Sequence, residues 1–280
     1  MAIKDMLLPL VGAPGPAAVA AIERCVAMAA DIGARITAVV IEVEVDARPR
    51  LTMSSDLDYA DTVAKTHSFS NARDLLSAFE SATLRLNANN DHAIRKLPEH
   101  DIAAYLAGWA RLTDLTVFPM KTHHGQCQKI VEQLIFESGR PVLLCPVEPA
   151  APLATTFENI AIAWDDTGPA ARAIADAMPL LQEAASVRIF TVTDAATPAG
   201  RDSGAALASH LALHGVAVRF DTVKREGASV GKVFGSYVKA ESVDLLVMGA
   251  YRHSRMNEWI WGGASNSMIG HPPCWVLMSH

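Results

Sequence analysis

The chain has 280 residues, of which half are hydrophobic and 19% are charged, and its formal net charge is −6 at pH 7. This length allows two domains with a core each, and the composition excludes a disordered chain. The negative charge argues against a general affinity for nucleic acid or anionic membranes, and no apolar run approaches the ~18 residues that a membrane helix needs.

The N-terminal segment resembles a signal peptide only superficially. The apolar run after Lys4 is short and is broken by Asp5, Pro9 and Gly12, so it predicts a buried strand followed by a turn. The four cysteines are scattered and form no CxxC pair, as expected in a reducing compartment. We therefore expect a cytoplasmic protein without a membrane partner.

The first half of the chain alternates predicted strands and helices. The strands are expected at 6–10, 35–43, 93–97, 114–118 and 140–145, and the helices at 17–32, 71–86, 101–111 and around 131–136. Strand–helix–strand order needs crossover connections, which indicates a parallel sheet. Residues 44–66 lose the apolar pattern and are predicted to be a long loop or mobile insert.

The same order recurs in the second half. Strands are expected at 159–164, 187–192, 217–223, 244–248 and 274–278, with helices at 170–182, 204–213, 230–240 and 263–269. Asp114-Leu-Thr-Val-Phe aligns with Asp244-Leu-Leu-Val-Met at an offset of 244 − 114 = 130, and 6–10 aligns with 160–164 at an offset of 160 − 6 = 154. The offsets differ by 154 − 130 = 24 residues, which the insert at 44–66 accounts for.

These patterns predict an α/β protein with two tandem, doubly wound, parallel five-stranded sheets related by a pseudo-twofold axis. The domains are expected at 1–148 and 156–280, joined by a linker rich in Pro and Ala. The last strands of the two halves, near 142–145 and 276–278, are expected to lie side by side because their apolar edges need cover. A homodimer of two such chains is a further expectation.

The segment after the strand at 244–248 has the features of an anion site. Gly249 ends the strand, and Gly262, Gly263 and Ser265 lie where the next helix begins. The first amides of a helix are unsatisfied and lie at its positive end, and glycine lets a phosphate approach the backbone closely.

This segment, GAYRHSRMNEWIWGG, resembles the universal stress protein family, whose signature is G-x2-G-x9-G followed by Ser or Thr. Gly249 and Gly262 hold the first and third glycine places. The closing segment PPCWVLMSH is also similar to that of the family, as is the opening strand that ends in Asp165 before an alanine-rich helix. The resemblance is specific over 158–280 and architectural over 1–148.

The resemblance implies a nucleotide-binding α-hydrolase-like fold and a pocket for an adenine nucleotide (ATP, ADP or AMP) with Mg²⁺. Asp165 would hold the ribose or adenine, and Val192 and Met248 would flank the base. The phosphates would be wrapped by Gly249, Gly262, Gly263, Ala264 and Ser265. Arg252 replaces the second glycine, and its side chain either blocks the site or pairs with phosphate.

Two functions follow from the resemblance. The first is a stress-response binding protein that binds an adenine nucleotide in its C-terminal domain. The alternative is a structural or interaction module that binds none. The first half has no Asp after its opening strand and no glycine spacing after Phe118, so no nucleotide is expected there.

Other candidate sites are weaker. His123, His124 and Cys127 are three potential zinc ligands, but an ordinary exposed loop is the favoured interpretation. His210 and His214 lie one helical turn apart without an HExxH pattern, which favours two surface histidines.

The pair Asp165-Asp166 fits either a magnesium site beside a phosphate or a cap for the next helix. The sequence contains no Ser–His–Asp spacing, GxSxG or GxxxxGK[ST] motif. We therefore do not expect an enzyme beyond, at most, a weak ATPase.

Overall fold

The computed structural model describes residues 2–44, 55–121, 125–149, 153–193, 201–250, 252–255, 258–261 and 263–280, with the backbone alone at 55–65, 201–202, 252–255 and 258–261. The first half runs through β1 (Asp5–Val11), α1 (Pro16–Asp31), β2 (Arg35–Glu44), α2 (Ser55–Leu86), β3 (Asn90–Pro98), α3 (Glu99–Ala110), β4 (Leu115–Met120), α4 (Gly125–Glu137) and β5 (Val142–Pro146). The second half runs through β6 (Asn159–Ala163), α5 (Gly168–Glu183), β7 (Ser186–Thr193), α6 (Arg201–Leu213), β8 (Val218–Lys224), α7 (Val230–Ala240), β9 (Leu245–Gly249), β10 (Arg252–Arg255), β11 (Glu258–Trp261), α8 (Gly263–Gly270) and β12 (Trp275–Ser279).

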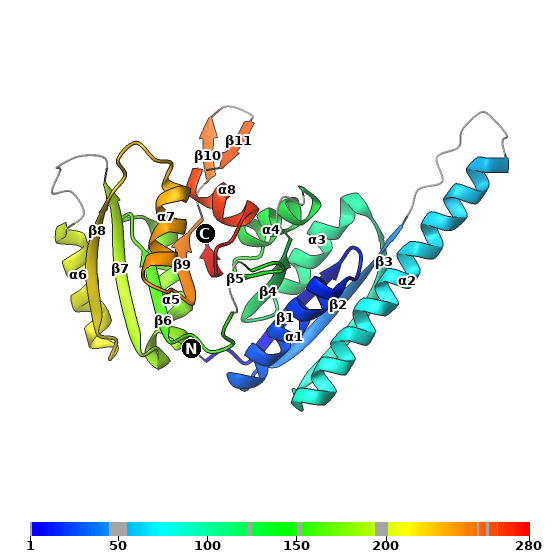
Figure 1. The fold of residues 1–280 in the computed structure, drawn as a ribbon, viewed down its shortest axis with the longest axis horizontal. Helices are drawn as coiled ribbons and strands as arrows, with labels where there is room; N and C mark the ends of the chain where they lie inside the picture. The colour runs from blue at the N-terminus through cyan, green and yellow to red at the C-terminus, as the bar shows by residue number, and fades with distance from the viewer. Residues whose placement is uncertain are drawn as a thin grey trace.

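The two halves join into one ten-stranded sheet, in the order β3-β2-β1-β4-β5-β12-β9-β6-β7-β8 (Figure 1). Each half contributes five parallel strands, and the order of the second half mirrors that of the first. The halves meet where β5 and β12 pair antiparallel, with Leu143 opposite Leu277. The predicted fold class and the predicted pairing of the last strands are therefore confirmed.

Helices cover both faces of the sheet, which explains the nearly continuous apolar runs of its central strands. On one face α1, α2, α5 and α6 enclose a core that includes Met6 and Leu8. On the other face α3, α4, α7 and α8 enclose a core that includes Leu7 and Val276. Adjacent residues of a strand thus enter different cores, as the alternation of side chains requires.

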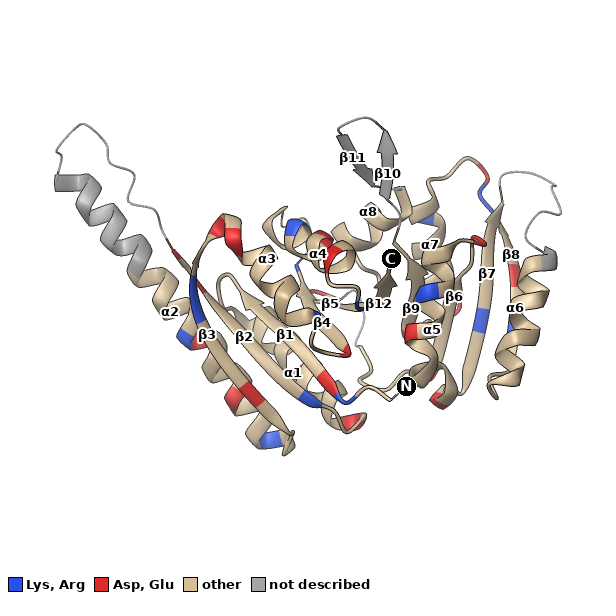
Figure 2. Cartoon of the chain, turned by 180° about the vertical axis from the view of Figure 1, so that it is seen from behind, with Lys and Arg blue, Asp and Glu red and all other residues tan. Residues whose placement is uncertain are grey.

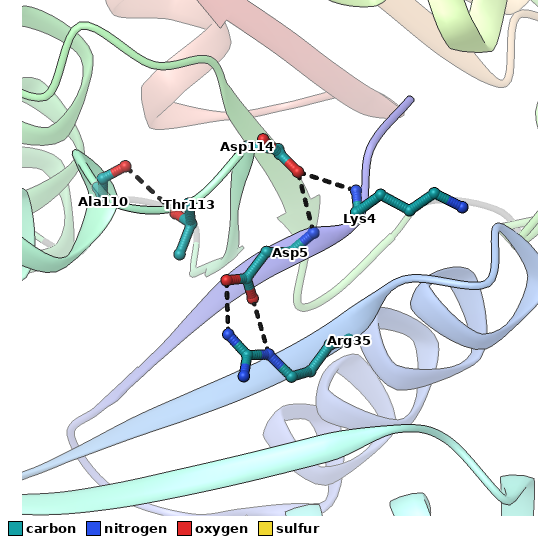
Figure 3. A network of polar contacts seen from close by, with 6 residues as sticks. All are labelled: Lys4, Asp5, Arg35, Ala110, Thr113 and Asp114. Atoms are coloured by element: carbon teal, nitrogen blue, oxygen red, sulfur yellow. Dashed lines mark hydrogen bonds and ion pairs between the residues drawn. The ribbon is translucent and has the colours of Figure 1, made fainter. Parts of the chain in front are cut away.

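An aspartate at the start of the fourth strand of each half ties it to the first strand. Asp114 Oδ2 accepts hydrogen bonds from the backbone N–H groups of Lys4 and Asp5 at 2.9 and 3.0 Å (Figure 3). In the second half, Asp244 Oδ2 accepts from the backbone N–H groups of Glu158 and Asn159 at 3.1 and 2.8 Å. The acceptors Asp114 and Asp244 are 130 residues apart and the donors of the two halves are 154 residues apart, which are the two offsets found in the sequence.

Helix α2 corrects one expectation. The predicted loop or insert at 44–66 is wrong from Ser55 onward, since a 32-residue helix begins there; residues 45–54 lie outside the described residues. Figure 1 shows α2 extending past the edge of the sheet. A helix that packs on a sheet has an apolar stripe on the face that it buries. The part of α2 that extends past the sheet buries no such face, so its sequence lacks the stripe from which a helix would be predicted. Despite this length, no described helix is apolar enough over a sufficient span to cross a membrane.

Candidate functional site

The second half has a topological switch point between β6 and β9. From this point the chain continues to β7 on one side and to β12 on the other. Helix α5 follows β6 on one face of the sheet, and α8 follows β9 on the other face. Ligands of open parallel sheets bind at such points, beyond the carboxyl ends of the strands.

Asp165 lies in a tight turn immediately beyond β6. Its side chain is exposed, and Oδ1 accepts a hydrogen bond from Thr167 Oγ1 at 2.6 Å. Thr167 is the N-cap of α5 and accepts a hydrogen bond from the backbone N–H of Ala170 at 3.3 Å. Asp166 completes the turn with a positive φ of 63°, a conformation that Asp adopts more readily than most residues. The turn fixes the Asp165 carboxylate beyond the carboxyl end of β6, next to the switch point.

Gly249 ends β9 where α5 begins. A Cβ on Gly249 would lie 2.5 Å from the backbone N of Ala170 and 2.7 Å from the backbone C of Pro169, far closer than side chains tolerate. The first turn of α5 therefore packs directly on the backbone of β9. In this structure Gly249 is required for the packing that holds the Asp165 turn against the neighbouring strand.

The start of α8 offers an open backbone. Gly263 is exposed, and a Cβ placed on it would have no atom within 4 Å. Ala264 is half-buried, and Ser265 is buried with an exposed fraction of 2%. The first-turn amides of a helix have no partner within it, so this end can accept an anion. Gly262 lies outside the described residues.

Val192 and Met248 lie on the α7–α8 face, on the strands that flank β6. Met248 is the register partner of Ala163, and Phe190 is the partner of Ala163 on the other side. Val192 is half-buried and lies two residues further towards the carboxyl edge, whereas Met248 is only 4% exposed. Val192 thus offers more surface to a ligand than Met248 does.

A two-stranded hairpin occupies most of the segment between β9 and α8. Its strands, β10 and β11, pair antiparallel, with Arg252 opposite Trp261. The sequence predicts no strands in this segment, so the hairpin is a feature that only the structure shows. The direction of the Arg252 side chain lies outside the described part of the structure, so its predicted role is not tested.

The sequence profile of the universal stress protein family matches residues 156–280. Residues 156–280 form a universal stress protein domain. Over the whole chain, the fold is similar to a universal stress protein from Archaeoglobus fulgidus DSM 4304, with a TM-score of 0.64, 14% identity and coverage of 98% of this chain and 97% of that chain. It is also similar to a functionally unknown protein from Pseudomonas aeruginosa PAO1, with a TM-score of 0.58, 11% identity and coverage of 99% and 92%. No curated protein matches the sequence.

The first half lacks the features that the universal stress protein domain places at its switch point. By the offset of 130, Pro119 takes the place of Gly249. Met120, which ends β4, is buried with an exposed fraction of 1%. Helix α1 begins after Gly15 without a side-chain cap, where α5 has Thr167. The expectation that this half binds no nucleotide stays a prediction.

The remaining candidates form no metal site among the residues that the structure describes. His123 and His124 lie outside the described residues, and Cys127 lies in α4 and not in a loop; burial raises the pKa of its thiol to about 11. His210 and His214 are exposed, with ring centroids 4.9 Å apart. Across the described ranges, no three side chains of His, Cys, Asp or Glu come together as metal ligands.

Proposed function

We propose that the universal stress protein domain binds an adenine nucleotide at the carboxyl edge of β6 and β9, as part of a stress response. The observation that carries the proposal is that the adjacent strands β6 and β9 are followed by an exposed carboxylate, Asp165, and by the open start of α8. The carboxylate accepts hydrogen bonds from hydroxyl groups, and the helix start donates them to phosphate.

Each end of the site matches a different part of the ligand. Asp165 Oδ1 is held by Thr167, and Oδ2 makes no hydrogen bond with the described residues, so it is placed to accept from a ribose hydroxyl. Val192 supplies apolar surface for the base. The amides at Gly263 and Ala264 donate to phosphate oxygens, without a Cβ at Gly263 to hinder their approach.

A magnesium ion fits this site only together with the phosphates. Asp165 and Asp166 are the adjacent carboxylates, and both are exposed. They do not form part of a group of three potential ligands in the described chain. Mg²⁺ takes one or two carboxylates and completes its coordination with phosphate oxygens and water. Nucleotide affinity is therefore expected to rise when Mg²⁺ is added.

Calorimetric titration with ATP, ADP and AMP, each with and without Mg²⁺, tests the proposal. We expect saturable binding to wild-type protein and about a tenfold loss of affinity for Asp165→Asn, which removes a charged acceptor. Asp166→Asn is the matched control in the titrations without Mg²⁺, because Asn adopts the same positive φ and the charge change is identical. An absence of binding to wild-type protein would contradict the proposal, and so would equal effects of the two variants without Mg²⁺.

A further inference from the structure

Strand β3 is one edge of the ten-stranded sheet, and none of the described strands pairs with its outer side. Helix α6 packs on the other edge strand, β8, whereas α2 packs mainly on α1 and β2. As a result, β3 is exposed along most of its length, and Ile94 has an exposed fraction of 41%. A nine-residue edge with exposed backbone groups is a template for pairing with another strand.

The hydrogen-bond pattern identifies the groups that face outward. The backbone N–H of Ile36 donates to the C=O of Asn89 at 2.9 Å, so alternate residues from Asn89 onward bond to β2. The backbone groups of the even-numbered residues from 90 to 96 therefore face away from the sheet. The outward N–H of His92 donates to its neighbour's carboxylate, Asp91 Oδ1, at 2.8 Å.

The charges of β3 are complementary to those of a second, antiparallel copy. Asp91 lies near the start of the strand, and Arg95 and Lys96 lie near its end; Figure 2 shows the two signs separated along β3. Across the described chain neither Asp91 nor Arg95 takes part in an ion pair. By contrast, Asp221 on β8, the other edge strand, already forms an ion pair within the chain, with 3.3 Å between its Oδ2 and Arg188 Nη1.

We propose that two copies of this chain associate through antiparallel pairing of their β3 strands about a twofold axis at Ala93. This register pairs outward-facing backbone groups with one another, His92 with Ile94 and Asn90 with Lys96. It also places each Asp91 opposite Arg95 of the second copy. These two residues form a non-hydrogen-bonded pair, the type of pair in which opposing side chains lie closest. The two sheets thereby become one continuous sheet across the dimer.

Charge substitutions at β3 test this register. Asp91→Arg places Arg opposite Arg, and Arg95→Asp places Asp opposite Asp, so each variant alone is expected to weaken dimerisation at least tenfold, as roughly estimated from cross-strand pair energies. An equimolar mixture of the two variants restores both opposite-charge pairs, so a heterodimer is expected. Asp101→Arg is the matched control, since it makes the same charge change at an exposed position of α3 and leaves dimerisation unchanged.

Sedimentation equilibrium over a wide concentration range measures the association of each sample, and circular dichroism verifies that each variant is folded. Dimeric wild-type protein, weakened single variants and a heterodimer in the mixture support the proposal. Monomeric wild-type protein overturns it. A dimer that both single variants leave unchanged, or a mixture that does not associate, overturns it as well.

Discussion

Replacing Gly249 with Ala tests whether the start of α5 depends on the bare backbone of β9. The new Cβ would lie 2.5 Å from Ala170 N and 2.7 Å from Pro169 C, and both are backbone atoms that cannot rotate away. Contact distances for such atoms are about 3.5–4.0 Å, so α5 must shift by roughly an ångström. Overpacking of this kind costs about 1–3 kcal/mol of the free energy of unfolding.

Urea denaturation followed by circular dichroism measures this cost. Gly235→Ala in α7 is the matched control, because its Cβ would have no atom within 4 Å and alanine stabilises a helix interior by about 0.5–1 kcal/mol. The two variants make the same chemical change and should therefore shift the denaturation midpoint in opposite directions. If Gly249→Ala were as stable as wild-type protein, the packing role assigned to Gly249 would be wrong.

Three further predictions concern stability and reactivity. Asp114→Ala and Asp244→Ala each remove the acceptor of two backbone N–H groups and should lower the free energy of unfolding by similar amounts, about 1–3 kcal/mol, in thermal denaturation; a loss from only one variant would contradict the equivalence of the halves. Burial raises the pKa of Cys274 from 9.0 to about 12, so the folded state retains this proton while the unfolded state loses it, and stability should fall between those pH values by about 1.4 kcal/mol per unit. Cys274→Ala should reduce the decline measured by urea denaturation at pH 8 and pH 10, to which the buried Cys127 thiol also contributes, and an unchanged slope would exclude the Cys274 thiol as a cause. All four cysteines are buried, so a thiol reagent should label native protein only as fast as it unfolds, and rapid labelling before unfolding would contradict their burial.

Much of the fold was predictable because the central strands are buried on both faces. Such strands appear as short apolar runs, and the offset between Asp114 and Asp244 is fixed by a contact that both halves repeat. The start of α2 was not predicted, because Asp56, Asp58 and Asp61 interrupt any apolar stripe there. The spacing of apolar residues in 57–64 was the weak helical signal that remained.

For the candidate site, the sequence predicts a position and little more. Ligands of parallel sheets bind beyond the strand ends, and that rule directs attention to the edge where Asp165 and Gly263 lie; ligand binding there stays a prediction. The packing role of Gly249 depends on how closely α5 approaches β9, and the spacing of glycines in a sequence does not contain that distance. The hairpin of β10 and β11 is not among the elements that the sequence predicts.

Hydrogen–deuterium exchange with and without nucleotide tests the central proposal most directly, because it reports on each helix start separately. Saturating ADP with Mg²⁺ should slow exchange of the amides from Gly263 to Ser265 at the start of α8 and leave those at the start of α4 unchanged. Unchanged exchange at α8 would contradict nucleotide binding at this site, and equal protection at α4 would contradict the restriction of binding to the second half.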